Sequence, residues 1–305
     1  MAEDQPDDPF HSGEVAVQER AGVRAGATKI GRSIDDEIAP AAAHFLVQRY
    51  TIYLGTLDAT GRPWASQLFG PPGFVGAVDP RTVRIDATPG PGDPLLENLR
   101  ADPHVGLLAI DLVTRRRFRV NGTAAVDADG TIVVTVAQAY GNCPKYIQRR
   151  EPVDVRQTPA DPARVTRHRA LTATARAQIA RADTFFLATA HPSAGADVSH
   201  RGGRPGFVAI ASDTRLVWPD YQGNMMFMSL GNVAVHPFAG LLFVDFETGD
   251  VVQLTGRATI DWDPAHAAGV PGAQRLVTFD VDEIVAAPAA SPLRWRLVEA
   301  SPANP

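Results

Sequence analysis

Short apolar runs separated by turn residues set the pattern of this chain. TIYLGTL (51–57) precedes the Gly-containing segment ATGRP, and GLLFVDF (240–246) precedes ETGD. Apolar runs of roughly four to eight residues bounded by turn signals predict β-strands. The segment ETGD predicts a hairpin loop, because glycine accepts positive φ. The consecutive apolar residues in GLLFVDF favour a strand covered on both faces, as in a small barrel.

Short helices are predicted between the strands. DPLLENLRADP (93–103) places Leu95 and Leu99 on one face of a helix. Asp93 would cap this helix, and Pro94 would take the first helical position, where no N–H is needed. Three further segments have the pattern of short helices: 36–49, 172–182 and 224–237.

An internal duplication organises these elements. Four segments of the first half recur in the second half in the same order, with a single one-residue slip in their spacing. The pairs are IYLGT (52–56) with FFLAT (185–189), PGF (72–74) with PGF (205–207), ADPHVGLLAID (101–111) with VHPFAGLLFVD (235–245), and NGTAAV (121–126) with TGRATI (255–260). Repetition at a fixed period indicates a repeated structural unit. We therefore predict two copies of one domain, each a six-stranded antiparallel barrel with a helix across it.

The predicted fold class is mainly β, with barrels and short helices. The duplication divides the chain into four parts. These are an N-terminal arm (1–39), a first copy with its connecting segment (40–150), a Pro-containing polar linker (151–174) and a second copy (175–305).

Composition and charge narrow the class of protein. Of 305 residues, 45% are hydrophobic and 21% charged, which is typical of a soluble globular chain. The net charge of −5 argues against a nucleic-acid partner, which would need a basic face. We expect the one basic run, RRRFR (115–119), to be a solvated strand or hairpin tip.

No membrane partner is expected, because no apolar stretch approaches the roughly 20 residues of a spanning helix. The acidic start MAEDQPDDPF is unlike a signal peptide, so we expect a cytoplasmic protein. The single cysteine, Cys143, excludes an internal disulfide and is expected to be inert. The eight histidines show no metal-binding spacing, so no metal site is expected.

One stretch, DVSHRGGRPGF (197–207), carries candidate chemistry. Successive strand side chains point to opposite faces, so His200 cannot easily act as the base for Ser199. No GxSxG elbow is present, which argues against a serine hydrolase. Arg201, with Arg204 across the Gly-rich turn, suits an anion. The alternative is a solvated hairpin with no ligand.

Several motifs together resemble the pyridoxamine 5′-phosphate oxidase-like group of FMN-binding split-barrel proteins, in particular its tandem-domain members. They are FHSGEVAVQERAG (10–22), YGNCPKYIQRR (140–150), GADVSHRGGRPGF (195–207), WPDYQGNMMFMSLGN (218–232) and GLLFVDFETGDVVQLTGRA (240–258). In single-domain members two barrels form a dimer, and flavin lies in the grooves between them. The resemblance therefore implies two tandem split β-barrels that form an intramolecular pseudo-dimer.

The resemblance also implies site residues. Ser199 and Arg201 match a Ser-x-Arg pair that contacts the flavin phosphate, and His200 and Arg204 lie beside them. In WPDYQGN, the residues Trp218 and Tyr221 would flank the flavin rings, while Asp220 and Asn224 would bond the ring edge or ribityl chain. The alternative for this segment is a core Trp followed by a turn.

One departure concerns the phosphate. The family places a lysine just after this strand, where the present chain has GNMMF, and Lys29 and Lys145 are its only lysines. The segment YGNCPKYIQRR could supply cations if the first copy caps the groove of the second. Its candidates are Lys145, Tyr146, Gln148 and Arg149; the alternative is a solvated basic segment.

The first copy provides an internal comparison. WASQLFGPPGF (64–74) corresponds to DVSHRGGRPGF, and Ser66 matches Ser199. Leu68 stands where the second copy has Arg201. We therefore predict one functional site per chain.

The resulting hypothesis is an FMN-binding oxidoreductase, a flavoprotein that acts as an NAD(P)H-linked reductase or an oxidase on a small molecule. FAD is the alternative cofactor. No side chain is identified as catalytic, and pyridoxamine-phosphate oxidase activity itself is not expected. The rival hypothesis is a non-catalytic binding protein for haem, a deazaflavin or another anionic ligand. A homodimer is retained as an alternative to the monomer.

Overall fold

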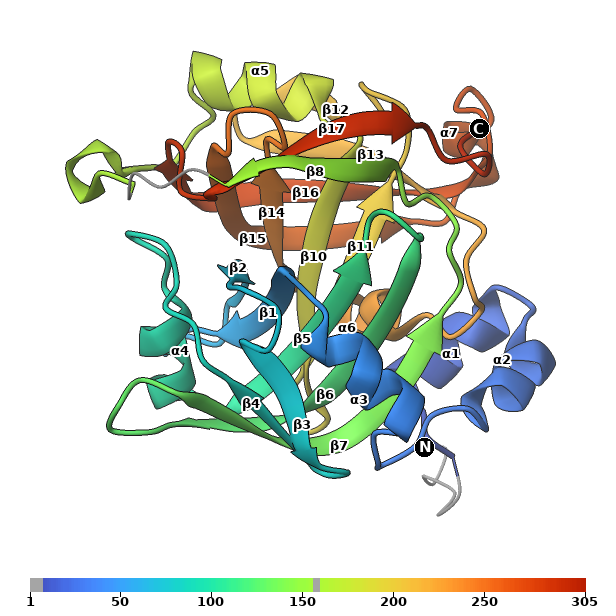
Figure 1. Ribbon diagram of the computed structural model, residues 1–305. Helices are drawn as coiled ribbons and strands as arrows, with labels where there is room; N and C mark the ends of the chain where they lie inside the picture. The colour runs from blue at the N-terminus through green and yellow to red at the C-terminus, as the bar shows by residue number, and fades with distance from the viewer. Residues whose placement is uncertain (1–7, 156–159) are drawn as a thin grey trace.

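The computed structural model describes residues 8–155 and 160–305. Residues 1–7 of the predicted arm and 156–159 of the predicted linker lie outside the described residues. Two β-rich halves, one above the other, meet through their strands (Figure 1).

The first copy is built on a seven-stranded antiparallel sheet of order β2-β1-β5-β6-β7-β4-β3. It includes helices α3 (Pro40–Val47) and α4 (Leu95–Ala101). Its strands are β1 (Thr51–Leu57), β2 (Pro63–Phe69), β3 (Val75–Asp79), β4 (Thr82–Ile85), β5 (His104–Asp111), β6 (Arg116–Val126) and β7 (Ile132–Asn142).

The second copy repeats this topology strand by strand, in the order β11-β10-β14-β15-β16-β13-β12. Its helices are α5 (Ala173–Arg181), α6 (Met228–Val235) and α7 (Pro264–Ala267). Its strands are β10 (Thr184–His191), β11 (Gly195–Gly202), β12 (Ala209–Ser212), β13 (Arg215–Tyr221), β14 (Phe238–Val244), β15 (Val251–Asp261) and β16 (Ala273–Ala287). The predicted duplication is confirmed, and so is a mainly β fold of two tandem split barrels.

The predicted count of six strands per copy is wrong, since each of these described sheets has seven along its path. Strands as short as β4 and β12 have too few apolar positions for an alternation to stand out. Each of the four predicted helical segments does contain a helix, shorter than predicted, at α3, α4, α5 and α6.

Elements outside the two seven-stranded paths tie the halves together. Strand β8 (Arg149–Val155) pairs with β17 (Leu293–Glu299), and β9 (Thr166–His168), which follows the 3₁₀ turn η1 (Pro162–Arg164), pairs with β16. At the N-terminal end, α1 (Ser12–Arg20) packs on α6, and α2 (Arg24–Gly31) follows it. The chain therefore crosses between the halves several times. No described helix has the length and apolar character needed to span a bilayer.

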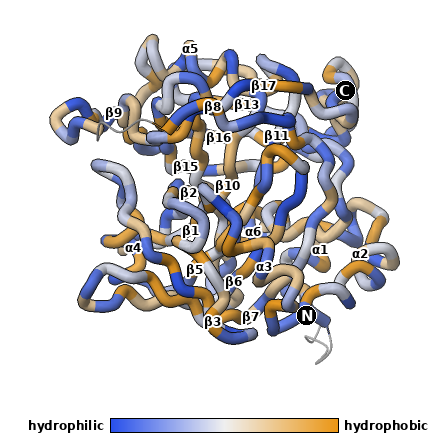
Figure 2. The backbone as a smooth tube through the Cα atoms, in the orientation of Figure 1, coloured by the Kyte–Doolittle hydropathy of each residue, from blue (hydrophilic) through white to orange (hydrophobic). Residues whose placement is uncertain are grey.

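The continuous apolar strands are buried on both faces, as their sequences predict. In β1, Ile52 and Leu54 pack in the core of the first copy, while Tyr53 between them packs in a separate core shared by both copies. In β14, Leu241 and Leu242 divide in the same way between the second copy's core and the shared core. Figure 2 shows a hydrophobic stretch at β5.

The shared core has an internal two-fold character. Tyr53 and Phe186, which are 133 positions apart, stack with ring centroids 3.4 Å apart and an interplanar angle of 15°. Both side chains are fully buried. Because equivalent residues of the two copies meet each other, the copies pack as an intramolecular pseudo-dimer.

Two equivalent glycines allow the backbones of the copies to touch. A Cβ atom at Gly106 would lie 2.6 Å from Cα of Asp197, and one at Gly240 would lie 2.7 Å from Cα of Trp64. Such distances are shorter than real Cβ contacts, and backbone cannot move aside as a side-chain end can. These positions therefore require glycine.

We predict that Gly106→Ala or Gly240→Ala lowers the free energy of unfolding by about 1–3 kcal/mol, the usual cost of overpacking. Urea denaturation measures the change. Gly76→Ala is the matched control, because a Cβ at Gly76 in β3 would meet open space. Equal midpoints for all three variants would contradict the close-approach argument.

Candidate functional site

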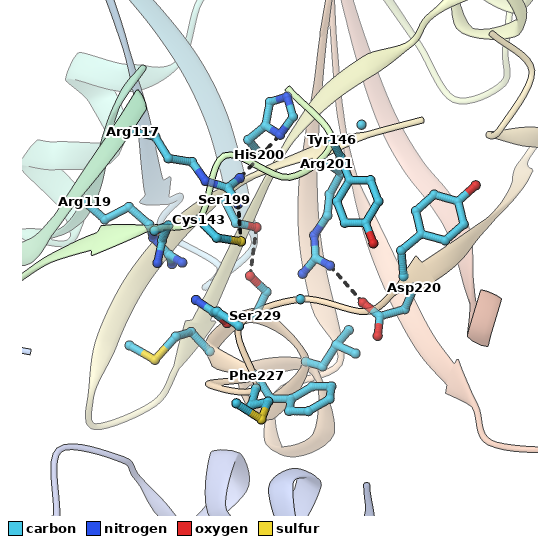
Figure 3. Close-up of a pocket in the computed structure, with 18 of the residues that line it drawn as sticks. Arg117, Arg119, Cys143, Tyr146, Ser199, His200, Arg201, Asp220, Phe227 and Ser229 are labelled. Carbon is cyan, nitrogen blue, oxygen red and sulfur yellow. Dashed lines mark hydrogen bonds and ion pairs between the residues drawn. The ribbon is translucent and has the colours of Figure 1, made fainter. Parts of the chain in front are cut away.

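A cavity of about 110 Å³ lies where the two copies meet (Figure 3). The first copy contributes residues from β6, the end of β7 and the segment after it. The second copy contributes the end of β11, the end of β13 and the start of α6. The residues that line the cavity are Arg117, Arg119, Asn142, Cys143, Tyr146, Ser199, His200, Arg201, Gly202, Phe207, Pro219, Asp220, Tyr221, Gly223, Asn224, Met225, Phe227, Met228, Ser229 and Leu230.

Strand β11 contributes consecutive residues to this cavity, among them Ser199, His200 and Arg201. The Oγ atoms of Ser199 and Ser229 lie 2.9 Å apart, and Ser229 Oγ also donates to Asp197 Oδ2 at 3.2 Å. Arg201 Nη1 donates to Asp220 Oδ1 at 2.9 Å. Figure 3 shows the Ser199–Ser229 contact and the Arg201–Asp220 ion pair among the residues that line the cavity. Ser199 and Arg201 are thus held by different partners, with their polar atoms available along one strand.

His200 is not placed as a base for Ser199. Its ring meets Phe186 of the shared core edge-on at 5.9 Å, and Arg117 Nη1 lies 3.4 Å from its Nδ1. Burial, reinforced by Arg117 and other nearby cations, lowers the pKa of His200 well below its ordinary value. The imidazole is therefore neutral at physiological pH and accepts from Arg117 through Nδ1.

Arginines concentrate positive charge at the cavity. Arg117 contacts His200 and the Cys143 sulfur, 3.8 Å from Nη2, and no ion pair joins it to any carboxylate of residues 8–155 or 160–305. Burial lowers the pKa of Arg117 to about 10, and Arg119 and Arg201 add repulsion. Such a pKa still leaves the side chain charged at neutral pH.

Two carboxylates balance this charge only in part. Arg119 pairs with Asp197, while Arg201 and Arg275 share Asp220. With Arg117, four arginines face two aspartates, so two positive charges are uncompensated. The Nε atoms of Arg117, Arg119 and Arg201 are also buried without a hydrogen-bond partner in the described part of the chain. Buried cations and donors of this kind are costly unless an anion completes them.

Strained backbone gathers at the same place. Tyr146, Met225 and Phe227 all line the cavity and have φ of 67°, 67° and 57°. Positive φ is uncommon for residues other than glycine, and such strain tends to cluster at ligand sites. The lining is therefore shaped at a cost in backbone energy.

A buried carboxyl group lies behind α6. Glu14 of α1 accepts from the backbone N–H of His11 at 3.0 Å and lies against Gly231, where only a glycine leaves room for it. Burial raises the pKa of Glu14 to about 8, although the His11 N–H and Arg119 oppose the rise. Glu14 is thus mostly protonated at neutral pH and neutralises little of the arginine charge.

The cavity collects part of the predicted site. Seven predicted residues line it: Tyr146, Ser199, His200, Arg201, Asp220, Tyr221 and Asn224. Lys145 is not among the lining residues. Trp218 is buried in the second copy's core, edge-on to Phe185 at 5.3 Å.

The remaining predicted residues have other partners. Gln148 is buried and accepts from Ser301 N at 2.7 Å, so it holds the C-terminal segment. Arg149 donates to Glu151 at 3.1 Å. Arg204 Nε donates to the Pro305 carbonyl at 2.7 Å.

Sequence reasoning missed the contribution of β6. The prediction of a solvated RRRFR segment is wrong for Arg119, which is 5% exposed, and for Arg117, which lines the cavity. Both are covered because this face of β6 is turned toward the second copy. The two-residue spacing of Arg117 and Arg119 places them on one strand face, and this was the available signal. Ser229, Met225 and Phe227 were missed as well.

The fold and this interface define a class of protein. A family model described as pyridoxamine 5′-phosphate oxidase matches residues 38–167 and again residues 171–294. The chain therefore belongs to the pyridoxamine 5′-phosphate oxidase family and carries its domain twice, as the sequence motifs indicated.

Solved structures resemble single halves of the chain. HupZ of Group A Streptococcus is 13% identical over 43% of this chain and 98% of its own, with a TM-score of 0.31. A FAD-binding protein from Mesorhizobium loti is 16% identical over 41% of this chain and 99% of its own, with a TM-score of 0.29. No curated protein matches the chain significantly.

We predict a pH-dependent stability that Glu14→Gln removes. The folded-state pKa of about 8 lies above the ordinary value of 4.5, so the folded state holds this proton more tightly than the unfolded state. Relative to Glu14→Gln, the wild type should therefore lose about 1 kcal/mol per pH unit between roughly pH 5 and pH 8. Urea midpoints at four pH values measure this. His11, which contacts the same carboxyl group, is present in both proteins, and parallel profiles would contradict the assignment.

Proposed function

We propose that the cavity binds the phosphate of FMN and that the protein is a flavin-dependent oxidoreductase. The observation that carries this proposal is the unpaired Arg117 beside Arg119 and Arg201, with two uncompensated positive charges. A phosphate monoester carries about two negative charges at neutral pH, which matches this excess. Three arginines and the hydroxyls of Ser199 and Ser229 offer suitable donors.

The remaining lining suits the rest of a flavin. Tyr146 and Tyr221 come from different copies, and their ring centroids lie 5.2 Å apart. In this proposal they flank the ring system, and Asp220 and Asn224 bond its polar groups. The cavity of about 110 Å³ is smaller than the roughly 300 Å³ of small ligand pockets. We infer that the strained segment at Met225 and Phe227 moves outward when the ligand enters.

When bound, the flavin would supply the electron transfer, as an NAD(P)H-linked reductase or an oxidase acting on a small molecule. The chain's own residues would bind, orient and shield it. Neutral His200 can donate through Nε2, which has no partner within the described residues. The arginines would hold the phosphate end of the flavin, and the shared core would exclude water from one side of the cavity.

We predict that the purified apoprotein takes up one FMN per chain at micromolar concentration and acquires the two-band visible spectrum of a flavin. FAD, a deazaflavin cofactor and haem are titrated in parallel. If the protein takes up haem and shows a Soret band, or binds the deazaflavin more tightly than FMN, that ligand and not FMN is the one the site binds. A protein that binds neither FMN nor FAD would overturn the proposal.

We predict that Arg201→Ala and Arg117→Ala each weaken FMN binding about 10- to 100-fold, because each loses a charge-assisted contact to phosphate. Fluorescence titration gives the Kd of each variant. Arg204→Ala is the matched control, since this arginine lies close in sequence but bonds the C-terminal carbonyl. Equal losses in all three variants would indicate a general charge effect and count against the assigned site.

A further inference from the structure

The duplication creates a second groove equivalent to the first. The first-copy strand β2 carries Ser66 where β11 carries Ser199, and Leu68 where β11 carries Arg201. Strand β15 carries Val251 and Gln253 at the positions that Arg117 and Arg119 occupy in β6, 134 residues earlier. The second groove therefore lacks all three arginines of the first.

The helices beside the two grooves show which residues of the two copies are equivalent. Asn98 of α4 donates to Thr56 Oγ1 at 3.1 Å, and Asn232 of α6 donates to Thr189 Oγ1 at 3.0 Å. The two asparagines are 134 positions apart, and the two threonines 133. The same register aligns Asp93, just before α4, with Phe227, just before α6.

Asp93 fills the second groove. Its Oδ1 accepts from Ser66 Oγ at 2.6 Å and from the Leu95 backbone N–H at 2.9 Å. Its Oδ2 accepts from Gln253 Nε2 at 3.0 Å. Three donors from two copies thus converge on one carboxylate, and only about 20 Å³ of cavity remains beside it.

The two grooves consequently have opposite charge. The arginine groove has two uncompensated positive charges and an apolar Phe227 at the aligned position. The Asp93 groove has a carboxylate and no cation among its lining residues. Burial raises the pKa of Asp93 to about 6, and the three donors oppose the rise, so the group is mainly ionised at neutral pH.

We infer that the second groove is an anion site that the chain occupies with its own Asp93 carboxylate. This inference rests on the proposed function, in which the arginine groove binds an external anion, a phosphate monoester or a similar small oxyanion. The built-in carboxylate excludes a second ligand. Each chain then binds one ligand although it contains two copies of the family domain.

The test removes the carboxylate and supplies another. Asp93→Ala removes the carboxylate that accepts from Ser66 Oγ, Gln253 Nε2 and the Leu95 N–H, and formate has the size of the missing group. We expect formate to raise the thermal midpoint of Asp93→Ala by on the order of 3 °C more than that of the wild type, against chloride at equal ionic strength and pH. In Asp93→Asn the amide fills the space, so the midpoint should respond to formate as the wild type does. An equal formate response in Asp93→Ala and wild type would overturn the inference.

A reciprocal variant tests the same idea without altering the second groove. Phe227→Asp places a carboxylate at the aligned position of the arginine groove, and Asp tolerates the left-handed backbone there. We expect Phe227→Asp to bind FMN at least tenfold more weakly than Phe227→Asn, which has the same shape without the charge. Equal affinities of the two variants would contradict the inference. Should Asp93→Ala fail to fold, this pair decides.

The two experiments separate the inference from the proposed function. A wild type that binds no FMN would refute the proposed function, while the formate response of Asp93→Ala would still report on the self-filled groove. FMN binding by the wild type without any specific formate response would refute the inference alone.

Discussion

The approach of the two backbones at Gly106 and Gly240 is the constraint on which the rest of the structure depends. At each of these points a strand of one copy lies directly against the backbone of a β-strand of the other, at Asp197 and at Trp64. This contact leaves no room for a side chain, so it sets the distance between the sheets. Tyr53 and Phe186 can then stack at the centre of the shared core. The same contact brings β6 against β11, and their arginines into one cavity.

Electrostatics distinguishes two grooves that the fold makes alike. A buried guanidinium without a carboxylate partner, such as that of Arg117, is unfavourable in a closed interface, and this cost is the basis for proposing that an anion joins the arginines. On the other side, the position of Asp93 supplies the negative charge from within the chain, and hydroxyl and amide donors suffice to hold it. The duplication thus allowed the two grooves to diverge, while the shared core kept their geometry equivalent.

Much of the site was accessible to sequence reasoning where neighbouring residues share one strand. Alternation along β11 put Ser199 and Arg201 on one face, and both line the cavity, but so does His200 between them. Trp218 shows where this reasoning stopped. It lies on the same strand as Asp220, but two residues deeper in the barrel, so it packs against Phe185 in the core. Whether a side chain packs in the core or lines the cavity depends on its position along the strand, which the periodicity of the sequence does not report.

The sequence by itself determined the duplication, the mainly β fold, the helices between the strands and the family, because periodicity and repetition are local or directly comparable properties. Only the tertiary structure decided that Arg117 and Arg119 join Arg201, some 80 residues away, and that Asp93 meets Gln253 across the two copies. Those contacts depend on how closely two sheets pack. Their packing distance follows from glycines and stacked rings whose partners lie more than 90 residues away in the chain.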